Sequence, residues 1–570
     1  MRQHYLLLIG QILFQALATA AGDLSKISRS WGSLSSYADN AEDAFGVQYV
    51  GLPDGCQVES VHTLQRHAQR FPEGNDITTT SGFAKKVANF TRANRGKAFL
   101  GPLAFLNTNV YVLKDTGLLT GYGAATVFSA GVSFWARYGR TLYNASASGL
   151  AYDFVFANGT ARPKITLRTT GQSRIWNSQI NWALGFFGPS FNATPDPYLT
   201  AWNGPFNVTI IPERGTENNT LASYDSCFND NLAANGYNAA QYQDRYKKIY
   251  LRSAVYRLQK FAPAGFAFDY KDLYAMQTTC AYEYAFIGAS AYCDIFTDEE
   301  WAGFENIQDM KCESPRDQRG SGAERSPGNL VYFLYSFGNP TGRAQGIGYV
   351  QELLARIKHE YITLSNSSVN ATLDQNADNF PANQQIYADF SHDDIIISAL
   401  TALSIDYFKD PPTLTKFPPS ANNHFTLSHL VPFGANLITE IIGCGSASPE
   451  PVEQRRIFYT PSQYGYDAAN ARYKFIRMRL NNAILPLSTI RGGKCGDLTS
   501  GRLDGLCELP KFLESQQDSY SRSNYDYACF GNYTLPNATE AIDYDGAIFQ
   551  GKDYAQREAR CGVASSQLNA

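Results

Sequence analysis

A strand-like run near the N-terminus ends in two arginines around a histidine. The segment from Val58 to Pro72 begins with apolar and β-branched residues, which favours a mostly buried strand. Its carboxyl end delivers Arg66, His67 and Arg70 to one place, just beyond a strand end, where α/β sheets bind ligands. Because a guanidinium grips phosphate oxygens in pairs and keeps its charge, two arginines beside an imidazole predict a site for a tetrahedral anion.

A second segment of related character lies far along the chain. It reads Tyr-Ala-Asp-Phe-Ser-His-Asp-Asp from Tyr387 to Asp394, and a helix-like run from Ile395 to Leu403 follows it. The two segments resemble, in the same order, the Arg-His-Gly-x-Arg-x-Pro signature and the strand, His-Asp pair and helix of the histidine acid phosphatases. Ala68 stands where that family usually has glycine.

This resemblance implies both a fold and a set of roles. The expected fold is α/β, a phosphoglycerate-mutase-like large α/β domain with a central mixed sheet plus a smaller, mostly α domain. A strand, loop and helix around 164–175 match the family segment that supplies a third phosphate-binding arginine, which is Arg174 rather than Arg168 because it stands at the helix entrance. The resemblance implies that His67 attacks phosphorus, that Asp393 protonates the leaving group, and that the phosphate is bound by Arg66, Arg70, Arg174 and His392.

The resemblance is closer still to the secreted fungal phytases. It covers roughly 30–530, and the run from Leu52 to Cys56 resembles the approach to the motif in those enzymes. Related phytases carry lysines that hold the other phosphates of a polyphosphorylated inositol, and the candidates here are Lys85, Lys86 and Lys311. Where the relatives have a pair of lysines, Lys311 stands alone, which weakens the expectation of strict phytate selectivity.

The length of 570 residues is enough for more than one domain. We expect a signal peptide over 1–21, a discontinuous large α/β phosphatase domain over 22–224 and 330–530, a smaller α domain with an inserted loop over 225–329, and a C-terminal tail over 531–570. In the second half of the large domain, apolar runs predict strands over 425–431, 435–442 and 473–484.

The N-terminal residues are typical of a secretory signal, because a short apolar run follows Arg2 and ends in small residues. Beyond it, the sequence has no apolar run of the roughly 18 residues that a membrane span needs. We therefore expect a secreted, extracellular protein. Asn-x-Ser/Thr sequons favour a glycoprotein, and they occur at Asn89, Asn144, Asn158, Asn192, Asn207, Asn218, Asn366, Asn370, Asn532 and Asn537.

The 10 cysteines of a secreted chain are best interpreted as disulfides, since none has Cys-x-x-Cys spacing. The family resemblance implies the pairs Cys56–Cys444, Cys227–Cys529, Cys280–Cys293 and Cys495–Cys507. Two cysteines are then left, and the expected fifth bridge, Cys312–Cys561, would attach the tail to the inserted loop.

Charge and spacing exclude several other classes of function. The net charge of −4, without a basic stretch, argues against nucleic acid or an anionic membrane as a partner. The sequence has no metal-ligand spacing such as His-Glu-x-x-His, so we expect neither a metal nor a cofactor. The expected partner is a small phosphate monoester, while the sequence leaves the oligomeric state open.

These observations predict a secreted acid phosphomonoesterase that releases orthophosphate from phytate (inositol hexakisphosphate) and related monoesters through a phosphohistidine intermediate. An acidic working range follows, because neighbouring arginines disfavour protonation of His67. Two alternatives stay open: a broad-specificity acid phosphatase with poor phytate turnover, and a non-catalytic phosphate-binding relative. The second would hold if Ala68 occupied a backbone conformation that only glycine tolerates.

Overall fold

The computed structural model describes most of the chain between residues 24 and 548. The described residues are 24–143, 152–153, 155–156, 158–188, 204–213, 217–231, 233–310, 332–453, 465–490, 495, 502–533 and 546–548. The predicted signal segment 1–21, Lys311 and the predicted Cys312–Cys561 bridge lie outside them.

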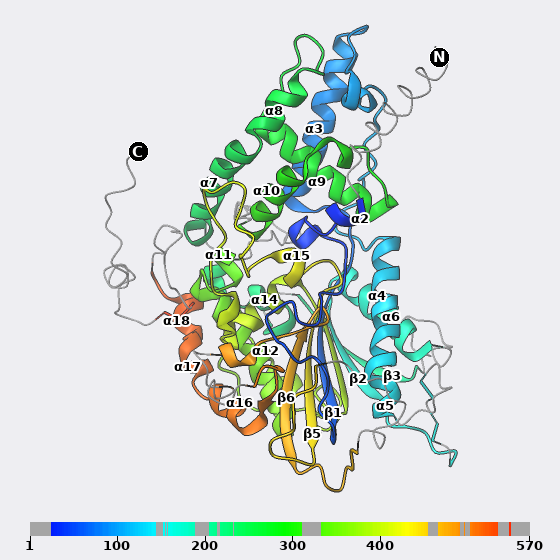
Figure 1. Cartoon of the computed structure of the whole chain (residues 1–570), viewed down its shortest axis with the longest axis vertical. Coiled ribbons are helices and arrows are strands. Elements are labelled where there is room, and N and C mark those ends of the chain that lie inside the picture. The colour runs from blue at the N-terminus through cyan, green and yellow to red at the C-terminus, as the bar shows by residue number, and fades with distance from the viewer. Residues whose placement is uncertain are drawn as a thin grey trace, which may run out of the picture.

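An eight-stranded mixed sheet forms the centre of the α/β part, in the order β3-β2-β4-β1-β5-β6-β7, with β8 also pairing with β6 (Figure 1). The first four strands in this order run parallel, and the others join as antiparallel neighbours. The bounds are β1 (Cys56–Arg66), β2 (Ile165–Thr170), β3 (Phe206–Ile211), β4 (Ile386–Ser391), β5 (Asn436–Cys444), β6 (Tyr473–Leu480), β7 (Ala483–Ile484) and β8 (Cys507–Glu508). The predicted α/β fold with a central mixed sheet is confirmed.

The parallel pairing of β1 and β4 brings the two sequence motifs together. Arg66, the last residue of β1, lies opposite Ser391, the last residue of β4. The next residues, His67 and His392, therefore leave the sheet side by side at the same edge. Every residue of β4 is buried, as expected for a central parallel strand that is covered on both faces.

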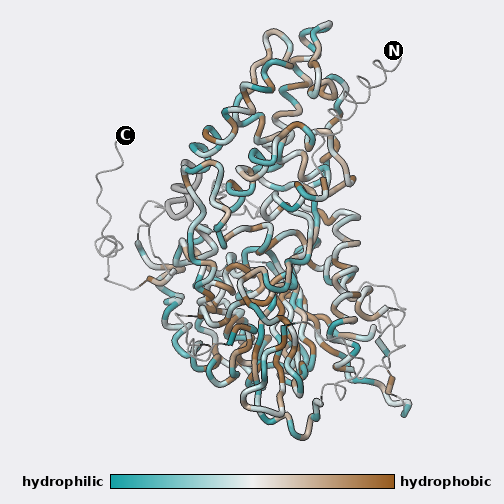
Figure 2. The backbone as a smooth tube through the Cα atoms, viewed as in Figure 1, coloured by the Kyte–Doolittle hydropathy of each residue, from teal (hydrophilic) through white to brown (hydrophobic). Residues whose placement is uncertain are grey.

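Two helix pairs cover the two faces of the sheet (Figure 1). On one face lie α4 (Gly121–Phe134) and α6 (Ser173–Phe187), and on the other lie α12 (Pro340–Lys358) and α14 (Asp393–Ala402). Alternate residues of the central strands belong to the two hydrophobic cores, one on each face of the sheet. Figure 2 shows hydrophobic residues gathered along these strands. The second helix pair is in close contact: a Cβ at Gly346 would stand 1.9 Å from the Ser398 carbonyl oxygen, so only glycine fits there.

A second group of helices stands above the sheet in Figure 1 and has its own core. It comprises α3 (Gly74–Ala93), α7 (Ala233–Tyr250), α8 (Arg252–Gln259), α9 (Tyr270–Ile287) and α10 (Asp298–Asp309). Phe83 and Val87 of α3 and Phe99 and Leu103 after it belong to this core. The predicted domain boundaries stay a prediction, but this packing places α3 and the segment after it with the helical part.

The predicted strand over 425–431 is wrong. This segment contains the short helix α15 (Leu427–Leu430), and its other residues are irregular. Its buried residues Leu427, Leu430 and Val431 have the i, i+3, i+4 spacing of a helix face, so the apolar run reflects burial rather than strand alternation. The remaining α-helices of the described residues are α2 (Leu24–Ile27), α5 (Arg140–Leu142), α11 (Tyr332–Tyr335), α13 (Ala371–Asp374), α16 (Leu509–Ser515), α17 (Ser519–Ser523) and α18 (Tyr525–Phe530).

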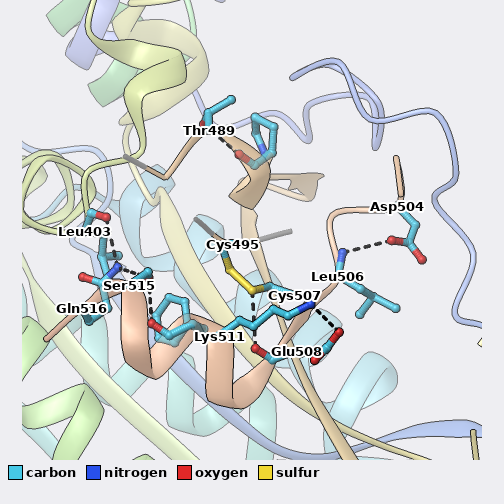
Figure 3. The surroundings of a disulfide bond; sticks show 12 residues. Leu403, Thr489, Cys495, Asp504, Leu506, Cys507, Glu508, Lys511, Ser515 and Gln516 are labelled. Carbon is cyan, nitrogen blue, oxygen red and sulfur yellow. Dashed lines mark hydrogen bonds and ion pairs between the residues drawn. A yellow bond between two sulfur atoms is a disulfide. The ribbon is translucent and has the colours of Figure 1, made fainter. Parts of the chain in front are cut away.

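Four disulfides join distant parts of the described chain. They are Cys56–Cys444, Cys227–Cys529, Cys280–Cys293 and Cys495–Cys507, the same four pairs that the resemblance implies. Figure 3 shows the last of these beside α16, where Lys511 donates a hydrogen bond to the Glu508 carboxylate at 2.8 Å. No helix within the described ranges is both long and apolar enough to span a membrane.

Candidate active site

His67 lies at the end of β1 with its ring held in one orientation. Its backbone N–H donates to the Ser391 carbonyl at 3.1 Å, and its ring Nδ1 lies 2.8 Å from the Ala68 carbonyl oxygen. A carbonyl only accepts, so Nδ1 carries the proton and Nε2 keeps its lone pair. Burial lowers the pKa of His67 well below its usual 6.5, and the nearby charges of Arg174, Arg66, Arg70 and His392 lower it further. The ring therefore stays neutral in acid.

Three arginines surround this ring, and the protein anchors each of them at one end of its guanidinium. Arg66 Nη1 donates to the carbonyl oxygens of Ser33 and Val431, both at 2.6 Å. Arg70 Nη1 donates to the Phe71 carbonyl at 3.0 Å. All three arginines are at most 3% exposed, so each is fixed within the protein.

Several other nitrogens of these guanidiniums have no partner in the protein. Within the described ranges, four buried nitrogens of the three arginines have neither a hydrogen-bond nor an ion-pair partner: Arg66 Nε, Arg70 Nε, and Arg174 Nε and Nη2. Buried N–H groups are rarely left unsatisfied, and such positive donors around one imidazole suit an anion with several oxygens. The geometry therefore fits a phosphate group placed against His67.

His392 follows β4 and completes the other side of the site. Its ring lies 5.8 Å from the His67 ring, measured between centroids. Its Nε2 is 2.9 Å from Glu213 Oε1 and 3.2 Å from the Tyr224 hydroxyl. Burial alone would raise the pKa of Glu213, but the charge and hydrogen bond of His392, helped by the Thr170 hydroxyl, lower it to about 2. Glu213 is thus ionised in acid and fixes the imidazole beside it.

Two neighbouring carboxyl groups begin α14. Asp393 Oδ2 forms an ion pair with Arg66 Nη2 at 3.0 Å, which places it on the phosphate side of the site. Asp394 accepts a hydrogen bond from the backbone N–H of Ile395 at 3.0 Å. Burial is the main cause that raises the pKa of Asp394 to about 7, with opposing effects from His392, which lowers it, and Asp393, which raises it.

A family model described as the histidine phosphatase superfamily (branch 2) matches residues 57–481, a range that includes both motifs and every site residue above. The chain belongs to this superfamily. It is a histidine acid phosphatase, an enzyme that hydrolyses phosphoric monoesters.

Its relatives carry similar names. The chain is 27% identical to "Phytase A" of Aspergillus oryzae, covering 74% of this chain and 80% of that protein, and 27% identical to "Phytase A" of Aspergillus fumigatus, covering 83% and 91%. Among solved structures, the phytase from D. castellii has a TM-score of 0.61 at 21% identity, with 89% of each chain covered. At that identity the structural likeness shows the shared fold.

The structure brings six of the predicted site residues of this phosphatase together, namely Arg66, His67, Arg70, Arg174, His392 and Asp393. It places the candidate specificity lysines differently. Lys86 Nζ is tied to Asp272 Oδ2 at 2.5 Å and to the Ala267 carbonyl at 2.8 Å, so it serves the start of α9. Lys85 is exposed, and Lys311 lies outside the described residues.

Two further predictions about this phosphatase concern Arg168, which lies near Arg174 in sequence, and Ala68, which follows His67. Arg168 of β2 is buried in an ion-pair network with Glu352 of α12 and Asp389 of β4, whereas Arg174 reaches the site from the start of α6. Ala68 is not among the described non-glycine residues with positive φ, so the alanine causes no backbone strain. The condition for a non-catalytic relative is therefore not met.

Sequence reasoning missed several residues that hold the phosphatase site. Glu73 pairs with both Arg70 and Arg174, and the Tyr282 hydroxyl accepts from Arg70 Nη1 at 3.2 Å. Glu213 follows the end of β3, so the strand-end rule that found His67 would have found it too. Tyr282 lies in the middle of α9, where no sequence pattern marked it.

Two buried carboxyl groups on α10 support the segments that anchor Arg66. Glu305 accepts from the backbone N–H groups of Gly32 at 2.7 Å and Ser428 at 2.9 Å, and Asp309 accepts from that of Leu427 at 2.8 Å. These N–H groups belong to the two segments whose carbonyl groups anchor the first arginine of the motif. The helical part thus helps to shape the phosphate site.

This pair predicts that the protein becomes less stable as the pH rises. Burial, together with the charge of Glu305, raises the pKa of Asp309 well above its usual 3.8. The unfolded chain releases this proton near its usual pKa while the folded protein retains it, so stability falls from there until the folded pKa is passed. Asp309→Asn keeps an acceptor for Leu427 and has no proton to lose. We expect its melting temperature to gain on the parent by a few degrees between about pH 4 and pH 7. A difference independent of pH would contradict this.

Proposed function

We propose that this phosphatase hydrolyses phytate and related phosphate monoesters in acid, through a phosphohistidine formed on His67. The observation that carries the proposal is the neutral His67 ring among four guanidinium nitrogens that have neither a hydrogen-bond nor an ion-pair partner within the described ranges. The relatives named "Phytase A" support phytate as a substrate. The resulting site neutralises the substrate charge, supplies a nucleophile and holds an acid.

In this mechanism each side chain has a separate task. The three arginines and His392 bind the phosphoryl oxygens and stabilise the charge of the transition state. His67 Nε2 attacks phosphorus in line as the bond to the ester oxygen breaks, and Asp393 gives that oxygen its proton. A water then attacks the phosphohistidine, Asp393 accepts the water's proton, and orthophosphate leaves with His67 restored.

One assay separates this function from its alternatives. Orthophosphate release from phytate and from p-nitrophenyl phosphate is measured across acid pH with the purified protein and a chelator present. We expect turnover of both esters, with kcat/KM for phytate at least equal to that for the aryl ester. Turnover of the aryl ester alone would indicate a general phosphatase, loss of activity on chelation a metal-dependent enzyme, and binding without turnover a non-catalytic relative.

We also propose that the protein is secreted and glycosylated, and that two of its sequons, at Asn218 and Asn207, differ in their use. Asn218 Nδ2 donates to Ser365 Oγ at 3.3 Å, to the Ser367 carbonyl at 3.1 Å and to the Val369 carbonyl at 3.0 Å. N-glycosylation would attach the sugar to this same nitrogen. By contrast, Asn207 is exposed on the edge strand β3.

The expected result is therefore an unmodified Asn218 and a glycan on Asn207. Glycosidase treatment in ¹⁸O water, followed by peptide mapping of the protein secreted from a eukaryotic host, reports both positions at once. The expectation fails if Asn218 carries a glycan at high occupancy while Asn207 does not.

A further inference from the structure

Glu73 lies between two of the three arginines of the site. Its Oε1 is 2.9 Å from Arg70 Nη2, and its Oε2 is 3.1 Å from Arg174 Nη1. The side chain of Glu73 is 8% exposed and those of both arginines are 3% exposed, so this is a buried bridge. It joins the end of the β1 motif to the start of α6, which are about 100 residues apart in sequence.

The bridge uses only part of each guanidinium. On Arg174 it occupies Nη1 and leaves the edge formed by Nε and Nη2, the edge that can hold two oxygens of one anion. On Arg70, Nη1 is held by the Phe71 carbonyl and the Tyr282 hydroxyl, Nη2 by Glu73, and Nε has no partner within the described ranges. The carboxylate therefore fixes the outer ends of both side chains and leaves donors for a substrate.

The surroundings of Glu73 leave its carboxylate to the two arginines. Glu73 is the residue that precedes α3, and its side chain makes no capping hydrogen bond to that helix. Gly117 passes close by with φ +63°, and a Cβ there would stand 3.1 Å from Glu73 Oε2 and 3.5 Å from Arg174 Nη1. The glycine leaves the space that the bridge needs.

We propose that Glu73 is a positioning residue, which holds Arg70 and Arg174 at a fixed separation so that their remaining N–H groups receive the substrate phosphate. This inference rests on the proposed function of the same site. Without the carboxylate, two buried guanidiniums would repel each other and lose their shared anchor. The opposite expectation is that a carboxylate this close repels phosphate, so that its removal would tighten binding. The two expectations therefore predict opposite changes in phosphate affinity when the carboxylate is removed.

Glu73→Gln decides between them, because it keeps the size of the side chain and removes its charge. We expect the dissociation constant of orthophosphate, measured by calorimetry, and the KM of p-nitrophenyl phosphate each to rise about tenfold or more, as for the loss of a hydrogen bond between charged groups. The matched control is Asp115→Asn, which removes a charge from an exposed residue two positions before Gly117 and should change neither value. Unchanged or tighter orthophosphate binding in Glu73→Gln would overturn the proposal.

A double-mutant cycle separates positioning from a general loss of structure. If Glu73 acts through Arg174, the effect of Glu73→Gln on orthophosphate binding should shrink in an Arg174→Ala background, and full additivity would overturn the proposal. Should Glu73→Gln not fold, Glu73→Asp, which retains the charge on a shorter side chain, is expected to weaken orthophosphate binding in the same direction. Calorimetry needs no turnover, so these outcomes can be read even from a parent protein that fails to hydrolyse phytate.

Discussion

His67→Ala is expected to abolish phosphate release, lowering kcat by at least roughly 10⁴-fold, the scale on which enzymes lose activity with their nucleophile. The reason is geometric, because His67 Nε2 is the only lone pair of that ring left free once Nδ1 donates to the Ala68 carbonyl. The three arginines are anchored by other groups, so the variant should remain folded and still bind orthophosphate. Steady-state release of orthophosphate from p-nitrophenyl phosphate and from phytate measures the loss.

A second histidine provides the control for this variant. His424 is exposed and stacks on the Tyr407 ring at 4.1 Å, away from the six site residues that the structure brings together. His424→Ala should therefore keep parental kcat. If His67→Ala retained more than a few per cent of parental turnover while folded, another group would have to be the nucleophile.

Asp393→Asn should harm alkyl phosphates far more than activated aryl phosphates. Transfer of phosphate to His67 expels an alkoxide from phytate or glycerol phosphate, which needs a proton, but a stabilised phenolate from p-nitrophenyl phosphate. We expect kcat for the alkyl esters to fall by the roughly 10²- to 10⁴-fold typical of general acid catalysis, with a smaller loss for the aryl ester. The amide oxygen can still accept from Arg66, so the anchor of the site is retained.

The neighbouring Asp394 provides the control for this variant. It lies next to Asp393, and burial raises the pKa of Asp394 to about 7 although the charge of His392 opposes this, so Asp394 holds a proton in acid. Asp394→Asn keeps the acceptor for the Ile395 N–H. This variant should not show the selective loss of activity on alkyl esters. Equal losses on both ester types in Asp393→Asn, or the selective loss in Asp394→Asn, would contradict the assignment of Asp393 as the general acid.

The residues that sequence reasoning located share a local signal. The rule about strand ends predicted the Arg-His-x-x-Arg segment, and the family resemblance pointed to the His-Asp segment, which also follows a buried strand. The register of Arg66 with Ser391 brings the two segments together. The resemblance implied a third arginine in the segment after another strand, and its place at the start of a helix selected Arg174 over Arg168. Strand ends and helix starts are visible in sequence because they depend on neighbouring residues.

The supporting residues depend on contacts between distant segments, which one sequence does not reveal. Glu73 stood directly after the motif, but its role depends on Arg174, which arrives on α6. Lys86 was predicted to bind a second phosphate, yet it forms an ion pair with Asp272 of α9. The same reasoning explains the error at 425–431, where an apolar run was interpreted as a strand although tertiary packing makes it a short helix with irregular ends.

The most direct test of the central claim is to trap the phosphoenzyme. The purified protein is mixed briefly with ³²P-labelled substrate in acid, quenched in alkaline denaturant because phosphohistidine is labile in acid, and digested for peptide mapping. The account predicts label on the peptide that contains His67, at a stoichiometry approaching one per active site, and none in His67→Ala. Label on a serine or on another histidine, or no label under conditions of burst turnover, would contradict it.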